Sequence, residues 1–428
     1  MSSRAVDGNR WGLMLRILND LNDLRQELQR LRTLSPPDWF FIEPVVTVLK
    51  QVQASKFATD PTLPPLITLS GSQIDAAYQQ ISQNTLAIIR QASYELGQLF
   101  RQQLPRASVQ FGQGEQVRGQ RFYPVQRAGI YLANGEARQL GVFLQQGLLA
   151  NAVGVPERIL MIDGDASTPI APALLVAAQE MGIEAIYSLP GATAIAALAL
   201  GYETLSPVEA IMGVGSAAVM WAKQLVSGWI TVDQPLGETP WMLVADETAN
   251  VRMLALDFIA QAEQDPQGRF VILVPDQAQA EAFTQWVGQY CREQEQSIAT
   301  EKAISHYGVV AVVPDTTTWA GWINQFAPQT LVLALEDPWE LVEKIQRAAT
   351  IFLGQRTIPQ PANYASPHPI LRYSLGTFRS ASRLSLQCFL RASHLYDNGV
   401  QPYPAWVKRL SQLETVIATQ VRLGLEGS

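Results

Sequence analysis

Short apolar runs alternate with longer alanine-rich segments through much of the chain. In the first part of this pattern, turn residues bound strand-like runs at 129–132, 158–162 and 184–187. The intervening segments, 140–153 and 171–181, are long enough to form helices. Strands that alternate with helices in this way predict parallel strands joined by crossover helices.

The same alternation returns later, so the sequence predicts a second parallel sheet. The later strand-like runs lie at 241–245, 270–275, 308–314 and 331–335. We therefore expect an α/β fold with two incomplete Rossmann-like parallel sheets, a helical N-terminal region and a C-terminal helical tail. The helical region is expected at 1–120 and contributes to the second sheet domain. The first Rossmann-like domain is expected at 121–235 and the second at 236–375. The tail is expected at 376–428, with its last helix at 406–425.

The N-terminal region carries a seam of apolar residues with helical spacing. Its members follow one another at intervals of three or four residues: Met14, Ile17, Leu21, Leu24, Leu28 and Leu31. This spacing predicts a helix over 14–31. Two interpretations stay open, because the helix can pack on its own domain or use its seam to bind a protein partner. Further on, we expect a second helical region at 72–104 and a strand pair or hairpin at 108–123.

Composition narrows the class of protein. The chain has 428 residues, of which 47% are hydrophobic and 16% charged, as in ordinary globular domains. Its net charge of -7 argues against sequence-independent binding of nucleic acid, which needs a cationic surface. No apolar run approaches the ~20 residues of a membrane span, and the polar opening shows no signal peptide, so we expect a cytoplasmic protein. Two cysteines, Cys291 and Cys388, are too few for a disulfide framework and are expected to be buried thiols.

Several characteristic motifs follow one another along the chain: Arg127-Ala-Gly-Ile-Tyr131, Gly191-Ala-Thr-Ala-Ile-Ala-Ala-Leu198, Gly201-Tyr-Glu-Thr204, Phe352-Leu-Gly354 and Tyr364-Ala-Ser366. Together they resemble the histidinol dehydrogenase family, in nearly colinear order from about Val45 to the C-terminus. Members of that family oxidise the amino alcohol L-histidinol to L-histidine in two hydride transfers to NAD, with one bound zinc, as a step of histidine biosynthesis. The resemblance also implies a homodimer in which the C-terminal tail reaches the other subunit's site.

The positions that match the family's NAD contacts are partly changed. The tyrosine is kept as Tyr131, the family's glutamine is Thr193, and its asparagine is Ser216. Shorter side chains reach less far, so we expect weakened NAD binding, although a site made by the backbone could survive. The turn Gly213-Val-Gly-Ser216 lacks the third glycine of a full dinucleotide motif. It fits either an anion-binding helix N-terminus or a tight turn without a ligand.

The positions that match the zinc ligands are all neutral. The resemblance maps them onto Gln261, Gln264, Asn363 and Thr419, where the family has glutamine, histidine, aspartate and histidine. Zinc prefers imidazole, thiolate and carboxylate donors, and neutral oxygens bring no charge to offset its desolvation. We therefore predict that the metal is lost. His306 is expected in a helix-to-strand connection and His394 in an amphipathic helix, so neither replaces the missing ligands.

The proton-transfer pair is replaced as well. The family's glutamate and histidine fall on Gln329 and Thr330, and neither an amide nor a hydroxyl titrates near neutral pH. On the substrate side, the resemblance assigns Thr239, His368 and Glu414. Two hypotheses follow. In the first, the protein is a catalytically silent family member, or pseudoenzyme, that acts as a binding or scaffold protein without cofactors. In the second, it is an active NAD- and zinc-dependent dehydrogenase for histidinol or another alcohol, with a rearranged site.

Overall fold

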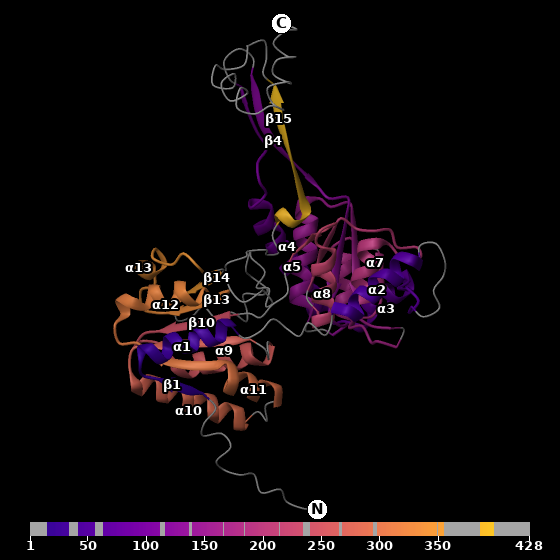
Figure 1. Ribbon diagram of the computed structural model, residues 1–428. Helices are drawn as coiled ribbons and strands as arrows, with labels where there is room; N and C mark the ends of the chain where they lie inside the picture. The colour runs from indigo at the N-terminus through magenta and orange to yellow at the C-terminus, as the bar shows by residue number, and fades with distance from the viewer. Residues whose placement is uncertain are drawn as a thin grey trace, which may run out of the picture.

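A computed structural model gives the architecture, which comprises two α/β domains and a projecting arm (Figure 1). The residues that the structure describes are 15–33, 42–55, 63–111, 116–136, 139–165, 167–183, 185–213, 215–233, 240–264, 268–293, 298–348, 350–354 and 386–397. No helix among these residues is long and apolar enough to cross a membrane.

The first domain is built on a sheet with the strand order β2-β7-β6-β5-β8-β9. Its strands are β2 (Ile67–Thr68), β5 (Arg127–Leu132), β6 (Glu157–Ile162), β7 (Ala185–Ser188), β8 (Ala210–Met212) and β9 (Thr231–Val232). All pairs are parallel except β2 with β7. Because β5 lies between the strands that follow it, the chain reverses its direction of winding there, and β5 and β8 form the topological switch point of this sheet.

Helices cover both faces of the first sheet. One apolar core lies under α3 (Gly71–Gln80), α4 (Gln83–Gln102), α5 (Leu140–Val153) and α6 (Pro172–Glu180). The other lies under α2 (Ile42–Ser55), α7 (Gly191–Leu200) and α8 (Ala217–Val226). Glycine, which favours a left-handed conformation, ends α5 at Gly154 with a φ of 84°.

The second domain repeats this plan with a fully parallel sheet of order β1-β12-β11-β10-β13-β14. Its strands are β1 (Arg16–Leu18), β10 (Pro240–Ala245), β11 (Arg269–Val274), β12 (Gly308–Val312), β13 (Thr330–Ala334) and β14 (Thr350–Leu353). The helices α9 (Val251–Gln264), α10 (Gln277–Glu293) and α11 (Ile298–Tyr307) cover one face, and α1 (Leu21–Thr33) and α12 (Trp319–Phe326) cover the other. The short α13 (Trp339–Val342) follows β13. The central strands are buried along their whole length, which explains their continuous apolar runs.

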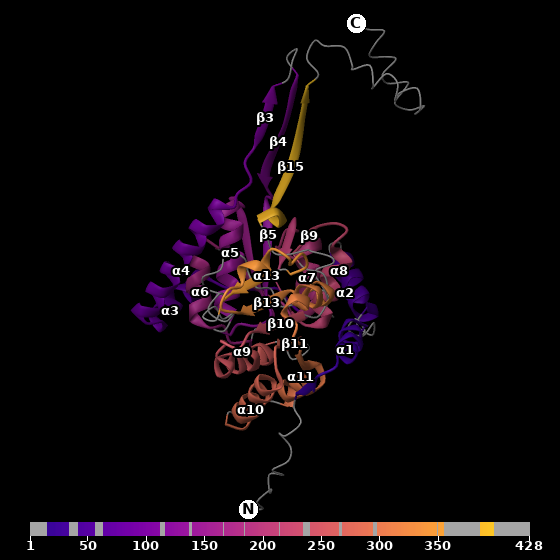
Figure 2. The same cartoon turned by 90° about the vertical axis from the view of Figure 1, so that its left-hand side faces the viewer.

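A three-stranded antiparallel sheet forms the arm, which extends away from both domains (Figures 1 and 2). Its strands are β3 (Ser108–Phe111), β4 (Val117–Pro124) and β15 (Leu390–Asp397), with β4 in the middle. The short helix η5 (Leu386–Phe389) packs its apolar side chains into the first domain and leads directly into β15.

The structure corrects several expectations for the N-terminal region. Residues 16–18 form strand β1 beside β12, so the helix begins only at Leu21. Leu24 and Leu28 are buried in the core of the second domain, which means that the seam packs internally and is not available to a protein partner. The region 1–120 contributes β1 and α1 to the second domain, as expected, whereas α2, α3 and α4 pack on the first domain.

Two further expectations concern the C-terminal part. His394 lies in strand β15 and not in an amphipathic helix, because residues 390–397 pair along their whole length with β4. The helix expected at 406–425 lies outside the described residues. The hairpin expected at 108–123 is present as β3 and β4.

Candidate functional site

The positions that match the family's NAD contacts converge at the carboxyl edge of the first sheet, next to the switch point. Tyr131 lies at the end of β5, Thr193 in the first turn of α7 and Ser216 directly before α8. In a doubly wound sheet this edge is where ligands bind. We call it the switch-point edge, made by the carboxyl ends of β5, β6, β7 and β8 and the residues that follow them.

Asp163, which follows β6, connects two of these elements. Its Oδ2 accepts a hydrogen bond from the Tyr131 hydroxyl at 2.5 Å, and its Oδ1 accepts one from the backbone N–H of Gly191 at 2.8 Å. Tyr131 is fully buried, and burial together with the neighbouring Asp163 carboxylate raises the pKa of its hydroxyl. The Tyr131 hydroxyl is therefore a neutral donor that is already engaged within the protein.

The glycine turn after β8 owes its composition to close packing against Tyr131. Gly213 has a φ of 123°, and a Cβ on it would lie 2.1 Å from the carbonyl oxygen of Tyr131. A Cβ on Gly215 would lie 2.7 Å from the ring of Tyr131. Both glycines are thus required by the fold itself, so their presence does not by itself indicate a bound phosphate.

A buried ion pair holds the backbone of Gly213 in this turn. The Lys223 ammonium of α8 and the Asp233 carboxylate after β9 have fully buried side chains and contact each other directly. Lys223 Nζ also donates to the carbonyl oxygen of Gly213 at 2.6 Å, and Asp233 Oδ2 accepts from the N–H of Gly213 at 3.0 Å. The backbone groups of Gly213 are therefore satisfied internally.

These contacts decide whether the switch-point edge fits NAD in the family's manner. Thr193 is almost completely buried and Ser216 is exposed. The hydroxyl of Tyr131 is buried and bonded to Asp163, and the N–H of Gly191 at the start of α7 is bonded to the same carboxylate. Of the three matching side chains, Tyr131 and Thr193 are buried and only Ser216 is exposed, so the edge fits the contacts that the resemblance implies poorly.

The positions of the proton-transfer pair lie at the amino edge of the second sheet. Gln329 donates its backbone N–H to the carbonyl oxygen of Pro240 at 2.8 Å, and Thr330 begins β13 beside Trp241 of β10. Gln329 is 8% exposed and Thr330 is 2% exposed. An amide and a hydroxyl thus occupy buried positions, where neither can accept and return a proton near neutral pH.

The amide of Gln261 lies near this edge. Gln261 sits in the last turn of α9, which ends shortly before β11, and its side-chain nitrogen donates to Asp257 Oδ1 at 3.2 Å. Within the described ranges, no three His, Cys, Asp or Glu side chains come together as a metal site. The backbone of Gln264 closes α9. Neutral amides with this neighbourhood fit a catalytic zinc poorly.

The remaining site residues assigned by resemblance lie outside the described residues: Thr239, Asn363, His368, Glu414 and Thr419. Four charged residues near the two edges escaped the sequence analysis: Asp163, Lys223, Asp233 and Arg269. Arg269 begins β11 beside Pro240, and burial lowers the pKa of its guanidinium to about 10. Position is the feature of the sequence that could have indicated Asp163 and Arg269, since both stand at strand ends.

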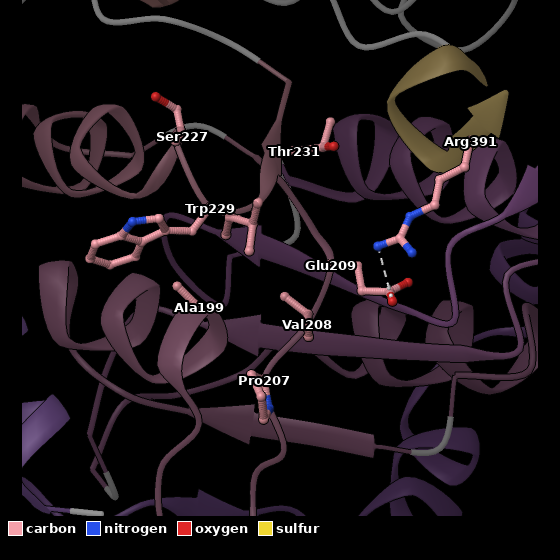
Figure 3. Close-up of a pocket in the computed structure, with 10 residues that line it drawn as sticks. Ala199, Pro207, Val208, Glu209, Ser227, Trp229, Thr231 and Arg391 are labelled. Carbon is pink, nitrogen blue, oxygen red and sulfur yellow. Dashed lines mark ion pairs between the residues drawn. The ribbon is translucent and has the colours of Figure 1, made fainter. Parts of the chain in front are cut away.

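A depression of about 490 Å³ lies at the opposite, amino edge of the first sheet, at the base of the arm (Figure 3). On one side Trp229 presents an exposed indole, and on the other Arg391 of β15 pairs with Glu209 at 3.1 Å. Glu209 also accepts from the N–H of Gln126 at 2.5 Å. The ion pair therefore anchors the arm to the sheet.

Two sheets of mainly parallel strands, each covered by helices on both faces, define an α/β protein of the Rossmann-like class. The family model described as histidinol dehydrogenase matches residues 51–422. The chain belongs to the histidinol dehydrogenase family, which confirms the resemblance of its motifs.

Relatives and a solved structure support this assignment over the whole chain. A protein of Synechocystis sp. called "Histidinol dehydrogenase homolog" is 46% identical over 415 residues, covering 97% of this chain and 99% of that protein. A histidinol dehydrogenase of Synechococcus sp. is 36% identical over 420 residues, covering 95% of each. The crystal structure of histidinol dehydrogenase from Elizabethkingia anophelis has a TM-score of 0.84 at 24% identity, covering 97% of this chain and 98% of that one, which confirms the expected fold class.

Proposed function

We propose that this protein is a histidinol dehydrogenase family member that no longer catalyses zinc-dependent oxidation and acts as a binding or scaffold protein. The observation that carries the proposal is the pair Gln329 and Thr330, which is buried at the amino edge of the second sheet and which the motif resemblance assigns to the family's proton-transfer positions. Loss of a general base alone costs about two to four orders of magnitude in rate.

The zinc positions support the same proposal. Gln261 is an amide that donates to Asp257, and the other matching positions are Gln264, Asn363 and Thr419. Such a set supplies no anionic or imidazole donor, so a divalent ion would lose its hydration without compensation. Loss of a metal that polarises the alcohol oxygen would remove several further kcal/mol of transition-state stabilisation.

The alternative function is an active NAD-dependent dehydrogenase with a rearranged site. It is favoured by the family scaffold, which is kept over the full length of both domains, and by the relatives named as the enzyme. The two functions make opposite predictions for turnover.

We expect no histidinol-dependent reduction of NAD by the purified protein. The rate should lie at least about a hundredfold below that of an active relative, because Gln329 cannot take the proton of the alcohol. The measurement is a steady-state absorbance assay of NADH at alkaline pH, with added zinc and with the Synechococcus enzyme as the positive control.

Turnover within that hundredfold range would sink the proposal. A double variant, Gln329→Glu with Thr330→His, restores the residue types of the family pair. The activity that this variant gains measures how much of the lost rate is due to the pair. The activity that is still missing measures how much is due to the metal positions.

We further propose that the arm mediates assembly into the homodimer that the family resemblance implies. Its strand β3 is exposed along its whole length, with Phe111 79% exposed, and Tyr396 on β15 is 77% exposed. A three-stranded sheet is stable when an apolar face is covered. We propose that a second copy of the chain covers the exposed aromatic side chains of the arm.

Replacing Phe111 with serine is then expected to raise the dimer dissociation constant at least about tenfold, because a large aromatic anchor is lost from the interface. Sedimentation equilibrium over a concentration series measures this change. The matched control is Trp339→Ser, since Trp339 is similarly exposed, at 65%, but lies in the second domain away from the arm. Equal dimerisation of all three proteins would contradict the assignment of the arm.

A further inference from the structure

We infer that Asp163 is a resident anion at the start of α7 and that it makes the switch-point edge reject dinucleotides. The inference rests on the proposed function, because it gives a reason why NAD, the cofactor that the family resemblance implies, does not bind at this edge. Asp163 is thereby assigned as a specificity-determining residue.

The first step is the position of the carboxylate. The N-terminus of a helix presents free N–H groups and the positive end of the helix dipole, and in doubly wound folds a phosphate binds there. In this protein Asp163 Oδ1 lies 2.8 Å from the N–H of Gly191, the first residue of α7. A built-in carboxylate thus takes the place that an external anion would need.

The second step is the Tyr131 hydroxyl. It donates to the other oxygen of the same carboxylate, Oδ2, and it is fully buried. Asp163 therefore engages two groups of the switch-point edge at once: the tyrosine that the family resemblance assigns to NAD, and the helix N-terminus two residues before Thr193.

The third step is charge. Among the residues that the structure describes, Asp163 forms hydrogen bonds with the Tyr131 hydroxyl and the Gly191 N–H and no ion pair, whereas the nearby Lys223 is paired with Asp233 and bonded to Gly213. A pyrophosphate that approached this edge would meet a fixed like charge and no unpaired ammonium from this buried pair. Like-charge juxtaposition disfavours a partner strongly when the groups are partly desolvated.

The test is the binding of NAD and of ADP-ribose to the full-length protein, measured by isothermal titration calorimetry without substrate. Asp163→Asn removes the charge but keeps the shape, and Asp163→Ser also frees space for a phosphate. Asp165→Asn is the matched control, because Asp165 is an exposed carboxylate whose hydrogen bonds come from Ser167 and Thr168 and not from the N–H of Gly191, which bonds to Asp163. Circular dichroism verifies that each variant is folded.

We expect wild type and Asp165→Asn to show dissociation constants for NAD above about 1 mM. We expect Asp163→Asn or Asp163→Ser to bind NAD at least about tenfold more tightly than either, because a like charge is removed from the phosphate position. Tight binding by wild type, or equally weak binding by both folded Asp163 variants, would overturn the inference. Binding without substrate is independent of turnover, so NAD binding by an inactive wild type would overturn this inference alone, whereas turnover with another electron acceptor would overturn only the proposed function.

Discussion

Replacing Lys223 with methionine is expected to lower the free energy of unfolding by about 3–5 kcal/mol, which is the usual effect of removing one member of a buried ion pair. Methionine fills similar space, so the loss is mainly electrostatic. It removes the cation that pairs with the Asp233 carboxylate, whose side chain is fully buried and also accepts from the N–H of Gly213. The turn after β8 should loosen for the same reason.

Guanidinium unfolding followed by circular dichroism measures this change. The control is Lys344→Met, which removes an exposed pair with Glu340 on the second domain and should change stability by less than about 0.5 kcal/mol. Adding Asp233→Asn to Lys223→Met should recover part of the loss, since a neutral amide no longer needs a cation. A single-variant loss below about 1 kcal/mol would contradict the importance given to the pair.

Replacing Leu28 with alanine is expected to cost about 2–5 kcal/mol, the range for a leucine removed from a packed core. Leu28 is fully buried in the cluster that includes Trp322 and Leu333. Leu21→Ala is the control from the same helix, because Leu21 is 43% exposed, and its cost should stay below about 1 kcal/mol.

The same pair of variants separates the two interpretations of the N-terminal seam. If the seam served a protein partner, Leu28→Ala would leave the isolated chain as stable as wild type. Deletion of residues 1–36 provides a second measurement, because it removes β1 and α1 from the second domain. We expect the truncated protein to aggregate or to unfold at a much lower denaturant concentration.

The apolar runs predicted the central strands of both sheets because those strands are covered on both faces. Strands β5 and β10 are examples, since their side chains are buried almost without exception. Strands of two to four residues, such as β1, β8 and β9, are too short to show a period of their own. In β1 the spacing of Ile17 from Leu21 also fits a helix, so the predicted helix included the residues of this strand.

The candidate site was predictable where a local motif marks it and not where distant residues pair. Gln329 and Thr330 stand in a recognisable stretch, and the structure places them at one sheet edge. The bond between Tyr131 and Asp163 depends on the register of β5 with β6, and the pair of Lys223 with Asp233 depends on the return of β9 beside β8. No spacing rule in a single sequence indicates such contacts.

Strands β1 and β15 also carry a consequence for synthesis on the ribosome. β1 is made first but pairs with β12 of the second domain, and β15 comes after that domain but pairs with β4 of the arm. The second domain and the arm are therefore each encoded in two separated parts of the gene, and neither can be expressed whole without the residues that lie between those parts. The arm can close only after translation has passed residue 397, so the surface proposed for assembly is completed only after the strands of both domains have been synthesised.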